Sequence, residues 1–146
     1  MKIPKPMKVE HEELHSELKK ATMEKGPLGD ASKAVAKVLH PHFVKEEEYA
    51  MPPLGLLAVL ASGRVSAKMK NTLAMTNKLR ADLDQMLKEH KQIVAALNRL
   101  VVEAKKEKKL EYVKFADKLI LHAQTEEVYY PASILIGKYL KLKLKK

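Results

Sequence analysis

The sequence predicts an all-α protein: an up-down-up-down four-helix bundle with a short extra helix between the second and third helices and a C-terminal helical extension. Only five glycines occur in 146 residues, and the helix-favouring residues Leu, Lys, Ala and Glu are abundant. Apolar residues recur three and four positions apart, and Gly or Pro separates the periodic stretches. Four long helices with short breaks are typical of a bundle, and we expect residues 1–146 to form a single domain.

Glycine and proline set the limits of the first two predicted helices. The first helix is predicted over residues 8–25, because Gly26-Pro27 stops it. Asp30 is a good N-cap for the second helix, over residues 30–51, which ends before two prolines. Pro41 lies within this span, where it would kink the helix or remove one backbone hydrogen bond.

The rest of the chain continues the helical pattern. Residues 54–62 are apolar on every side, which predicts a short buried helix that ends at Gly63. Ser66 can cap a further helical stretch before the third long helix. Pro131 predicts the end of the fourth long helix. The third helix, the fourth helix and the C-terminal helical piece are predicted over residues 75–106, 110–130 and 132–144.

Composition excludes several classes of function. The absence of cysteine rules out disulfides, thiolate metal sites, iron–sulfur clusters and cysteine nucleophiles. No apolar run approaches the roughly 20 residues of a transmembrane helix, and the N-terminus has no apolar signal region, so we expect a cytoplasmic protein without a membrane partner. The net charge is +10, but only three of the 28 basic residues are arginine. A lysine-rich solvated surface explains this charge, and we expect no specific nucleic-acid partner.

An internal repeat relates the two halves of the chain. Glu10-His11 in the first predicted helix resembles Glu89-His90 in the third. The helix that follows each of them carries a His-x-x-x-Glu motif, which begins at His42 in one half and at His122 in the other. Each half is therefore a helix with one such histidine, followed by a helix with a histidine and a glutamate one turn apart.

Helical phase places polar side chains on the inward faces of all four long helices. These side chains follow the three-then-four spacing of the apolar residues around them. The same phase turns the neighbouring Glu47, Glu48 and Glu127 away from the core. The inward residues, which we interpret as candidate metal ligands, are His11, His15, His42, Glu46, His90, His122 and Glu126.

Two inward carboxylates need compensation by positive charge. A buried, unpaired carboxylate costs several kcal/mol, and a domain has only about 5–15 kcal/mol of net stability. Lysine is absent from the inward faces, so a bound cation is the simplest compensation. Imidazole and carboxylate without thiolate suit iron, manganese or zinc, and two bridging carboxylates suit a pair of metals. The alternative is a structural bundle whose polar core is satisfied by hydrogen bonds and water.

These motifs resemble the hemerythrin-like (HHE cation-binding) family from Glu10 to about Pro131. The most specific parts are the two His-x-x-x-Glu motifs, each with a second glutamate and then a proline after it. The resemblance implies a four-helix bundle with two iron ions, a non-haem di-iron centre with an oxo or hydroxo bridge. It implies that one iron is held by His11 and His42, the other by His90 and His122, and that Glu46 and Glu126 bridge both.

Two positions depart from the oxygen-carrying members of that family. Those proteins have a second histidine on the third helix, where this chain has Met86, and a His-x-x-x-x-Asp motif on the last helix, where this chain has Glu126 one residue sooner. The pattern is more similar to di-iron repair or nitric-oxide-handling relatives. His15, one turn after His11, is either a further ligand to the iron held by His11 and His42 or a hydrogen-bond donor beside it.

Ligand counting predicts an open site. Four histidines, two bridging carboxylates and an oxo or hydroxo bridge give about five ligands per iron, which leaves a position for a small molecule. We therefore expect a protein that binds or reduces dioxygen, peroxide or nitric oxide. The alternative is a non-catalytic module that senses or stores iron or oxygen. Tyr49, Tyr129 and Tyr130 follow the two glutamates, and we expect them to pack the end of the bundle or, for one of them, to donate a hydrogen bond to the centre.

Overall fold

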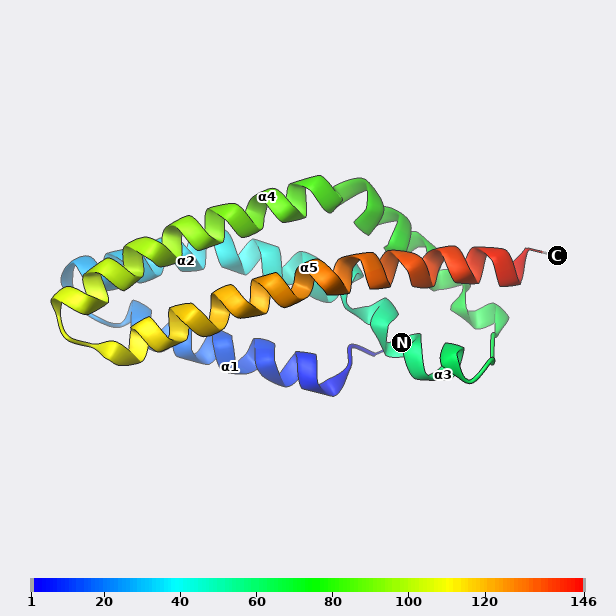
Figure 1. The fold of residues 1–146 in the computed structure, drawn as a ribbon, viewed down its shortest axis with the longest axis horizontal. Helices are drawn as coiled ribbons and strands as arrows, with labels where there is room; N and C mark the ends of the chain where they lie inside the picture. Colours follow the sequence, from blue (N-terminus) through cyan, green and yellow to red (C-terminus); the bar gives the residue numbers. More distant parts are fainter. Residues whose placement is uncertain (1, 146) are drawn as a thin grey trace.

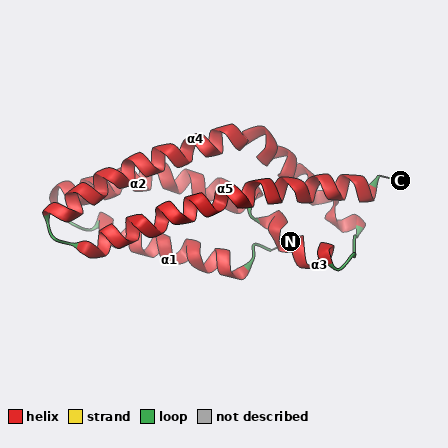
Figure 2. Ribbon diagram, in the orientation of Figure 1, coloured by secondary structure: helices red, strands yellow, loops and turns green. Residues whose placement is uncertain are grey.

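The computed structural model describes residues 2–145, which form a bundle of four long helices without a strand (Figures 1 and 2). The long helices are α1 (Lys5–Thr22), α2 (Gly26–Lys45), α4 (Asn71–Lys106) and α5 (Leu110–Leu144). Each packs against the next along the chain, and α5 also contacts α1, which closes the ring. The turns from α1 to α2 and from α4 to α5 lie at the same end (Figure 1). The predicted fold class is confirmed.

The turn between α1 and α2 is shorter than the sequence predicted. Gly26 has a φ of 72°, in the left-handed region that favours glycine. Pro27 occupies the first turn of α2, where the missing N–H of proline removes no helical hydrogen bond. The prediction that Asp30 caps the second helix is therefore wrong, because the helix begins four residues earlier.

The second helix continues past Pro41 and changes its winding at Glu46. A π-helical turn, Glu46–Ala50, follows α2 directly, and the Met51 amide donates a 2.8 Å hydrogen bond to the Glu46 carbonyl across it. A turn of this kind inserts one residue into the helical path, and such insertions are frequent at functional sites. The exposed position of Pro41 lets the carbonyl that it leaves unpaired face water.

A short crossover connects the two halves of the bundle. It consists of a 3₁₀ turn (Pro52–Leu56), the predicted extra helix α3 (Leu57–Ala61) and a second 3₁₀ turn (Ala67–Lys70) that leads into α4. The Ser66 hydroxyl accepts a 3.2 Å hydrogen bond from the Lys68 amide, as expected of a cap. α3 is only partly buried, since Leu57 is half exposed.

The last helix does not stop where proline predicted it would. α5 continues through Pro131 to Leu144, so the fourth helix and the C-terminal extension are one element. Pro131 lies on the exposed side of α5, where the freed carbonyl of Glu127 can be hydrated. Proline is tolerated in a helix interior when that unpaired group is not buried.

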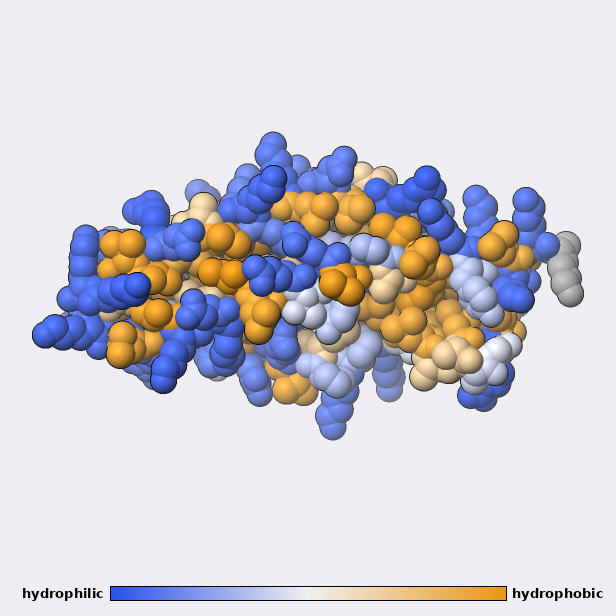
Figure 3. Space-filling view, in the orientation of Figure 1, coloured by the Kyte–Doolittle hydropathy of each residue, from blue (hydrophilic) through white to orange (hydrophobic). Residues whose placement is uncertain are grey.

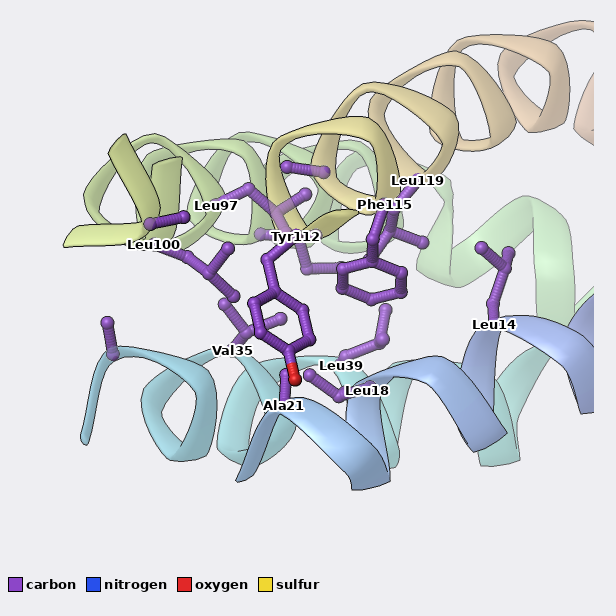
Figure 4. Close-up of a cluster of buried hydrophobic side chains, with 14 of the residues drawn as sticks. Leu14, Leu18, Ala21, Val35, Leu39, Leu97, Leu100, Tyr112, Phe115 and Leu119 are labelled. Carbon is purple, nitrogen blue, oxygen red and sulfur yellow. The ribbon is translucent and has the colours of Figure 1, made fainter. Parts of the chain in front are cut away.

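The bundle core is apolar at both ends and polar between them. At the end near the α1–α2 turn, leucine, valine and aromatic side chains from all four long helices point toward one another (Figure 4). At the other end, Leu54 and Leu60 from the crossover pack against Ile136 and Leu140 of α5. The candidate metal ligands lie between these two apolar regions.

The surface of the bundle mixes charged and apolar residues. Figure 3 shows hydrophilic residues over much of one face with apolar residues between them, and a broader apolar area where the crossover adjoins the last part of α5. None of the described helices combines the length and apolar character that a membrane-spanning segment requires.

Candidate metal centre

Four histidines and two glutamates converge in the polar layer of the core. Each of the four long helices contributes one imidazole, α5 also contributes Glu126, and the π-helical turn contributes Glu46. The carboxyl groups are almost fully inaccessible to solvent, with exposed fractions of 0% for Glu46 and 2% for Glu126. The histidines, all buried, are His11, His42, His90 and His122.

Each pair of neighbouring helices forms one half of this layer. The ring centroids of His11 and His122 are 4.9 Å apart, and those of His42 and His90 are 4.8 Å apart. The ligand atoms of each group lie within 4.8 Å of one another. The first position groups His11 and His122 with both glutamates, and the second groups His42 and His90 with the same two glutamates.

The two carboxylates connect the two positions. Glu126 Oε2 lies 3.3 Å from His11 Nε2 and 2.9 Å from His122 Nε2. Its other oxygen, Oε1, lies 3.3 Å from His90 Nε2 and 4.0 Å from His42 Nε2. Each position thus receives its own oxygen of Glu126.

Glu46 divides its oxygens in the same way. Oε1 lies 3.5 Å from His11 Nε2, and Oε2 lies 3.5 Å from His42 Nε2. A carboxylate that presents one oxygen to each of two ligand groups has the orientation of a bridge between two cations. Both glutamates have this orientation.

A second set of carboxylates faces the outer nitrogens of the histidines. Glu89 Oε1 lies 2.8 Å from His42 Nδ1, and Glu10 Oε1 forms the corresponding hydrogen bond with His122 Nδ1. Glu47 and Glu127, both about half exposed, lie 3.7 and 3.6 Å from the Nδ1 atoms of His11 and His90. A carboxylate on Nδ1 orients the ring, leaves Nε2 free to bind and raises its basicity.

The contacts repeat with the symmetry of the sequence. Glu10 and Glu89 each directly precede a histidine, and each contacts the His-x-x-x-Glu histidine of the opposite half of the chain. Glu47 and Glu127 each follow a bridging glutamate, and each contacts the histidine of α1 or α4. The two halves of the centre are therefore related by an approximate two-fold axis.

Burial, neighbouring charges and hydrogen bonds shift the pKa values of these groups. It lowers the pKa of His11 and of His90, which favours the neutral imidazole that binds metals. Burial and the neighbouring Glu46 charge raise the pKa of Glu126 well above its usual value. Although burial opposes it, hydrogen bonds with Glu126 and His42 lower the pKa of Glu46 to about 2. Without a cation, burial and the charge of Glu46 therefore disfavour the ionised form of Glu126.

Tyr130 joins the second position. Its hydroxyl donates a 2.5 Å hydrogen bond to Glu46 Oε2 and lies 3.1 Å from His42 Nε2 and 3.0 Å from His90 Nε2. Burial raises the pKa of Tyr130 above its usual value. The hydroxyl of Tyr49 bonds instead to Asp82, beside Met86.

The nitrogen and oxygen atoms of this site are better suited to bind cations than to form hydrogen bonds with one another. Glu46 Oε1 and His122 Nε2 are buried without a well-formed hydrogen bond, although they lie 3.5 Å from His11 Nε2 and 2.9 Å from Glu126 Oε2. Buried polar atoms without a partner are rare in native proteins. Nitrogen and carboxylate oxygen are donors that iron, manganese and zinc accept. These residues therefore fit a metal-binding site with two adjacent positions.

A comparison with known families agrees with this geometry. The family model of the hemerythrin HHE cation binding domain matches residues 3–133. The chain belongs to this family. No curated protein and no solved structure matches it significantly. The hemerythrin HHE match covers all six inward ligand candidates and ends just beyond Tyr130.

The structure corrects the expected pairing of the histidines in this hemerythrin HHE domain. The resemblance placed His11 with His42 and His90 with His122. The structure groups His11 with His122 and His42 with His90. The pairs form across the α1–α5 and α2–α4 contacts.

His15, also predicted to face inward, is exposed. The buried residues of α1 centre on Leu14 and Leu18, and His15 lies about 80° around the helix from the middle of this face, because each residue turns by about 100°. Its ring lies 6.3 Å from that of the equally exposed His40. The structure does not bring His15 into either ligand group.

Sequence reasoning missed the roles of Glu10 and Glu89, and it left open which of three tyrosines would donate a hydrogen bond to the centre. The repeat itself carried a signal for the first two, because a glutamate precedes the histidine in both halves. Tyr130 was one of three tyrosines beyond the glutamates, and no sequence feature singled it out.

Two surface grooves lead to the first position. A groove of about 610 Å³ between α1 and α5 is lined by Val9, Glu10, Leu121 and His122, among others. A second groove, of about 410 Å³ between α1 and α2, reaches His11 and Glu47. Each groove is thus lined by one histidine of the His11–His122 position.

Proposed function

We propose that the protein is a non-haem di-iron protein that binds or reduces a small oxidant: dioxygen, peroxide or nitric oxide. The observation that carries this proposal is the orientation of Glu46 and Glu126, each of which offers one oxygen to each histidine pair. Two metals held this closely by nitrogen and oxygen donors are suited to joint binding of a small ligand. Membership in the hemerythrin HHE family supports the same function.

Different residues would bind the metals, orient the ligands and exclude water. The four Nε2 atoms and four carboxylate oxygens would hold two irons, which supply the redox chemistry. Glu10, Glu47, Glu89 and Glu127 orient the imidazoles through Nδ1. Lys45 donates a 2.7 Å hydrogen bond to Glu89 and fixes that carboxylate in turn. The apolar cluster at the end of the bundle near the α1–α2 turn shields one side of the centre from water.

The test is anaerobic reconstitution with iron(II), followed by metal analysis and optical spectra after addition of dioxygen, peroxide or nitric oxide. We expect two irons per chain and a spectral change with at least one oxidant. A spectrum that decays quickly with release of product indicates an enzyme. A stable, reversible adduct indicates the alternative, a module that senses or stores oxygen or iron without turnover.

The matched controls are Glu126→Ala and Glu127→Ala, neighbouring glutamates of which only the first faces both positions. The oxidant response should disappear in Glu126→Ala and persist in Glu127→Ala. One iron or none in the reconstituted wild-type protein would overturn the di-iron proposal.

A further inference from the structure

We propose that Tyr130 is itself a metal ligand at the His42–His90 position, so that external small molecules bind at the His11–His122 position. This inference rests on the proposed di-iron centre. It makes the two metal positions unequal, although the histidines and glutamates around them are arranged symmetrically.

The distances around the Tyr130 oxygen are those of a shared coordination sphere. Two ligands at right angles on a metal with bonds of about 2.1 Å lie about 3.0 Å apart. The oxygen lies 3.0 Å from His90 Nε2, 3.1 Å from His42 Nε2 and 2.5 Å from Glu46 Oε2. It therefore lies at this spacing from the two histidine nitrogens of one position, and closer to Glu46 Oε2, to which it donates a hydrogen bond.

Packing holds Tyr130 in this place. Its exposed fraction is 1%, and it belongs to an apolar cluster with Leu79 and Met86 of α4. A tyrosine ring has two rotatable bonds, and close packing leaves it no alternative direction. Binding replaces the phenol O–H bond by an oxygen–metal bond, and the proton leaves to solvent.

The internal repeat shows that this oxygen has no counterpart at the first position. Glu46 corresponds to Glu126, so the residue that corresponds to Tyr130 is Ala50, which has no side-chain donor. The tyrosine before it, Tyr49, directs its hydroxyl to Asp82 on α4. Within the described chain, the symmetry of the ligand set is broken at this pair of residues.

The two grooves described above are lined by histidines of the first position, and Tyr130 is not among their lining residues. The α1–α5 groove is lined by His122 and the α1–α2 groove by His11, and these are the two histidines of the first position. A small ligand that enters by either groove meets the metal that lacks a tyrosine. The added donor and the access routes thus point to the same division of roles.

The first test uses the iron(III)-loaded protein and resonance Raman spectroscopy. A tyrosine bound to iron(III) gives a visible charge-transfer band with enhanced phenolate vibrations. These should be present in the wild type and in Tyr129→Phe, and lost in Tyr130→Phe with both irons retained. Two bound irons with the same visible spectrum in wild type and Tyr130→Phe would overturn the assignment, whereas failure to bind two irons in the wild type would count against the di-iron centre itself.

The second test measures where azide binds, and it does not depend on the fold of the Tyr130 variant. Leu121 and Leu135 are equally exposed on α5, at 63% and 62%, but only Leu121 lines the groove to His122. Leu121→Trp should slow azide association with the iron(III) protein several-fold, and Leu135→Trp should leave the rate unchanged. Equal rates in the two variants would overturn the assignment of the access route.

Discussion

Individual atoms decide what each acidic residue does in this centre. Glu126 and Glu127 are adjacent, yet one is buried with an oxygen toward each metal position and the other is half exposed against His90 Nδ1. Glu46 and Glu47 divide in the same way. A rotation of about 100° between successive residues separates a carboxylate that faces both positions from one that contacts an outer histidine nitrogen.

Glu126→Ala should therefore remove the paired site, and Glu127→Ala should weaken it. Loss of Glu126 takes one oxygen from each position, so we expect at most one metal per chain. Loss of an orienting carboxylate lowers metal affinity by about 10–100-fold. Metal analysis after reconstitution and a competition titration with a chelator check both. Equal losses in the two variants would contradict the phase argument.

A second residue-scale prediction concerns Glu24, after the end of α1. Hydrogen bonds from Lys109 and Tyr112 lower the pKa of Glu24 from its ordinary 4.5. The ionised form is thus favoured in the folded state, so its stabilisation is complete above pH 4.5 and disappears as the pH falls through the lowered pKa. Glu24→Gln should lower Tm at neutral pH, and the difference should vanish in acid.

Thermal melts from neutral to acid pH check this, with the exposed Glu12→Gln of α1 as the control. A Glu24→Gln deficit that stays constant with pH would show that packing, and not charge, is responsible.

Inward residues were predictable from sequence because phase and repeat agree, and the six side chains that converge were all among the candidates. The pairing of the histidines was not predictable, because spacing gives depth along the bundle but not which neighbouring helix a ring meets. His15 was misplaced because positions 14 and 15 are both compatible with a stripe that includes His11. Burial of Leu14 decides between them.

At the scale of the helices, two features could not be predicted from the spacing of apolar residues. The presence of the four long helices follows from their apolar periodicity. The end of α5 does not, because Pro131 lies on an exposed side of the helix and does not stop it. The π-helical turn that carries Glu46 has no residue signature. The turn does not change the direction of the Glu46 side chain, because Glu46 is its first residue and continues the helical phase of α2.

Close contact between α4 and α5 depends on one glycine. A methyl group on Gly137 would place its carbon 2.6 Å from the Cβ of Thr76, well inside van der Waals contact. Gly137→Ala should lower the free energy of unfolding by about 1–3 kcal/mol, as overpacking does. The exposed neighbour Lys138→Ala should change it by no more than about 0.5 kcal/mol. Denaturant unfolding of both variants is the measurement, and a Gly137→Ala protein as stable as wild type would contradict this contact.

At the scale of the whole molecule, the polar layer makes stability depend on its ligand. Two buried carboxylates and four histidines occupy the middle of the bundle, between apolar regions. Burial and the neighbouring Glu46 charge raise the pKa of Glu126 well above its usual value, so ionisation of both carboxylates without a bound cation is unfavourable.

Metal removal should lower the free energy of unfolding by several kcal/mol. A ligand that binds only the folded state adds about 4 kcal/mol when its free concentration is about 1,000 times its Kd. Calorimetric melts of metal-loaded and chelated protein test this, and Glu126→Ala should show a much smaller difference than wild type. Equal melting temperatures for the two wild-type forms would contradict a buried metal centre.

The sharing of ligands between the halves of the chain has a consequence for how metal is lost. Each position takes one histidine and one glutamate from α1, α2 or the π-helical turn, and one of each from α4 or α5. His11 and Glu126 are 115 positions apart, and an unfolded chain must give up loop entropy to bring such distant residues together. Separation of the two helix pairs would take half of these histidine and glutamate donors from both positions at once. If both positions hold a metal, as proposed, opening of the bundle along this seam should release the two metals together.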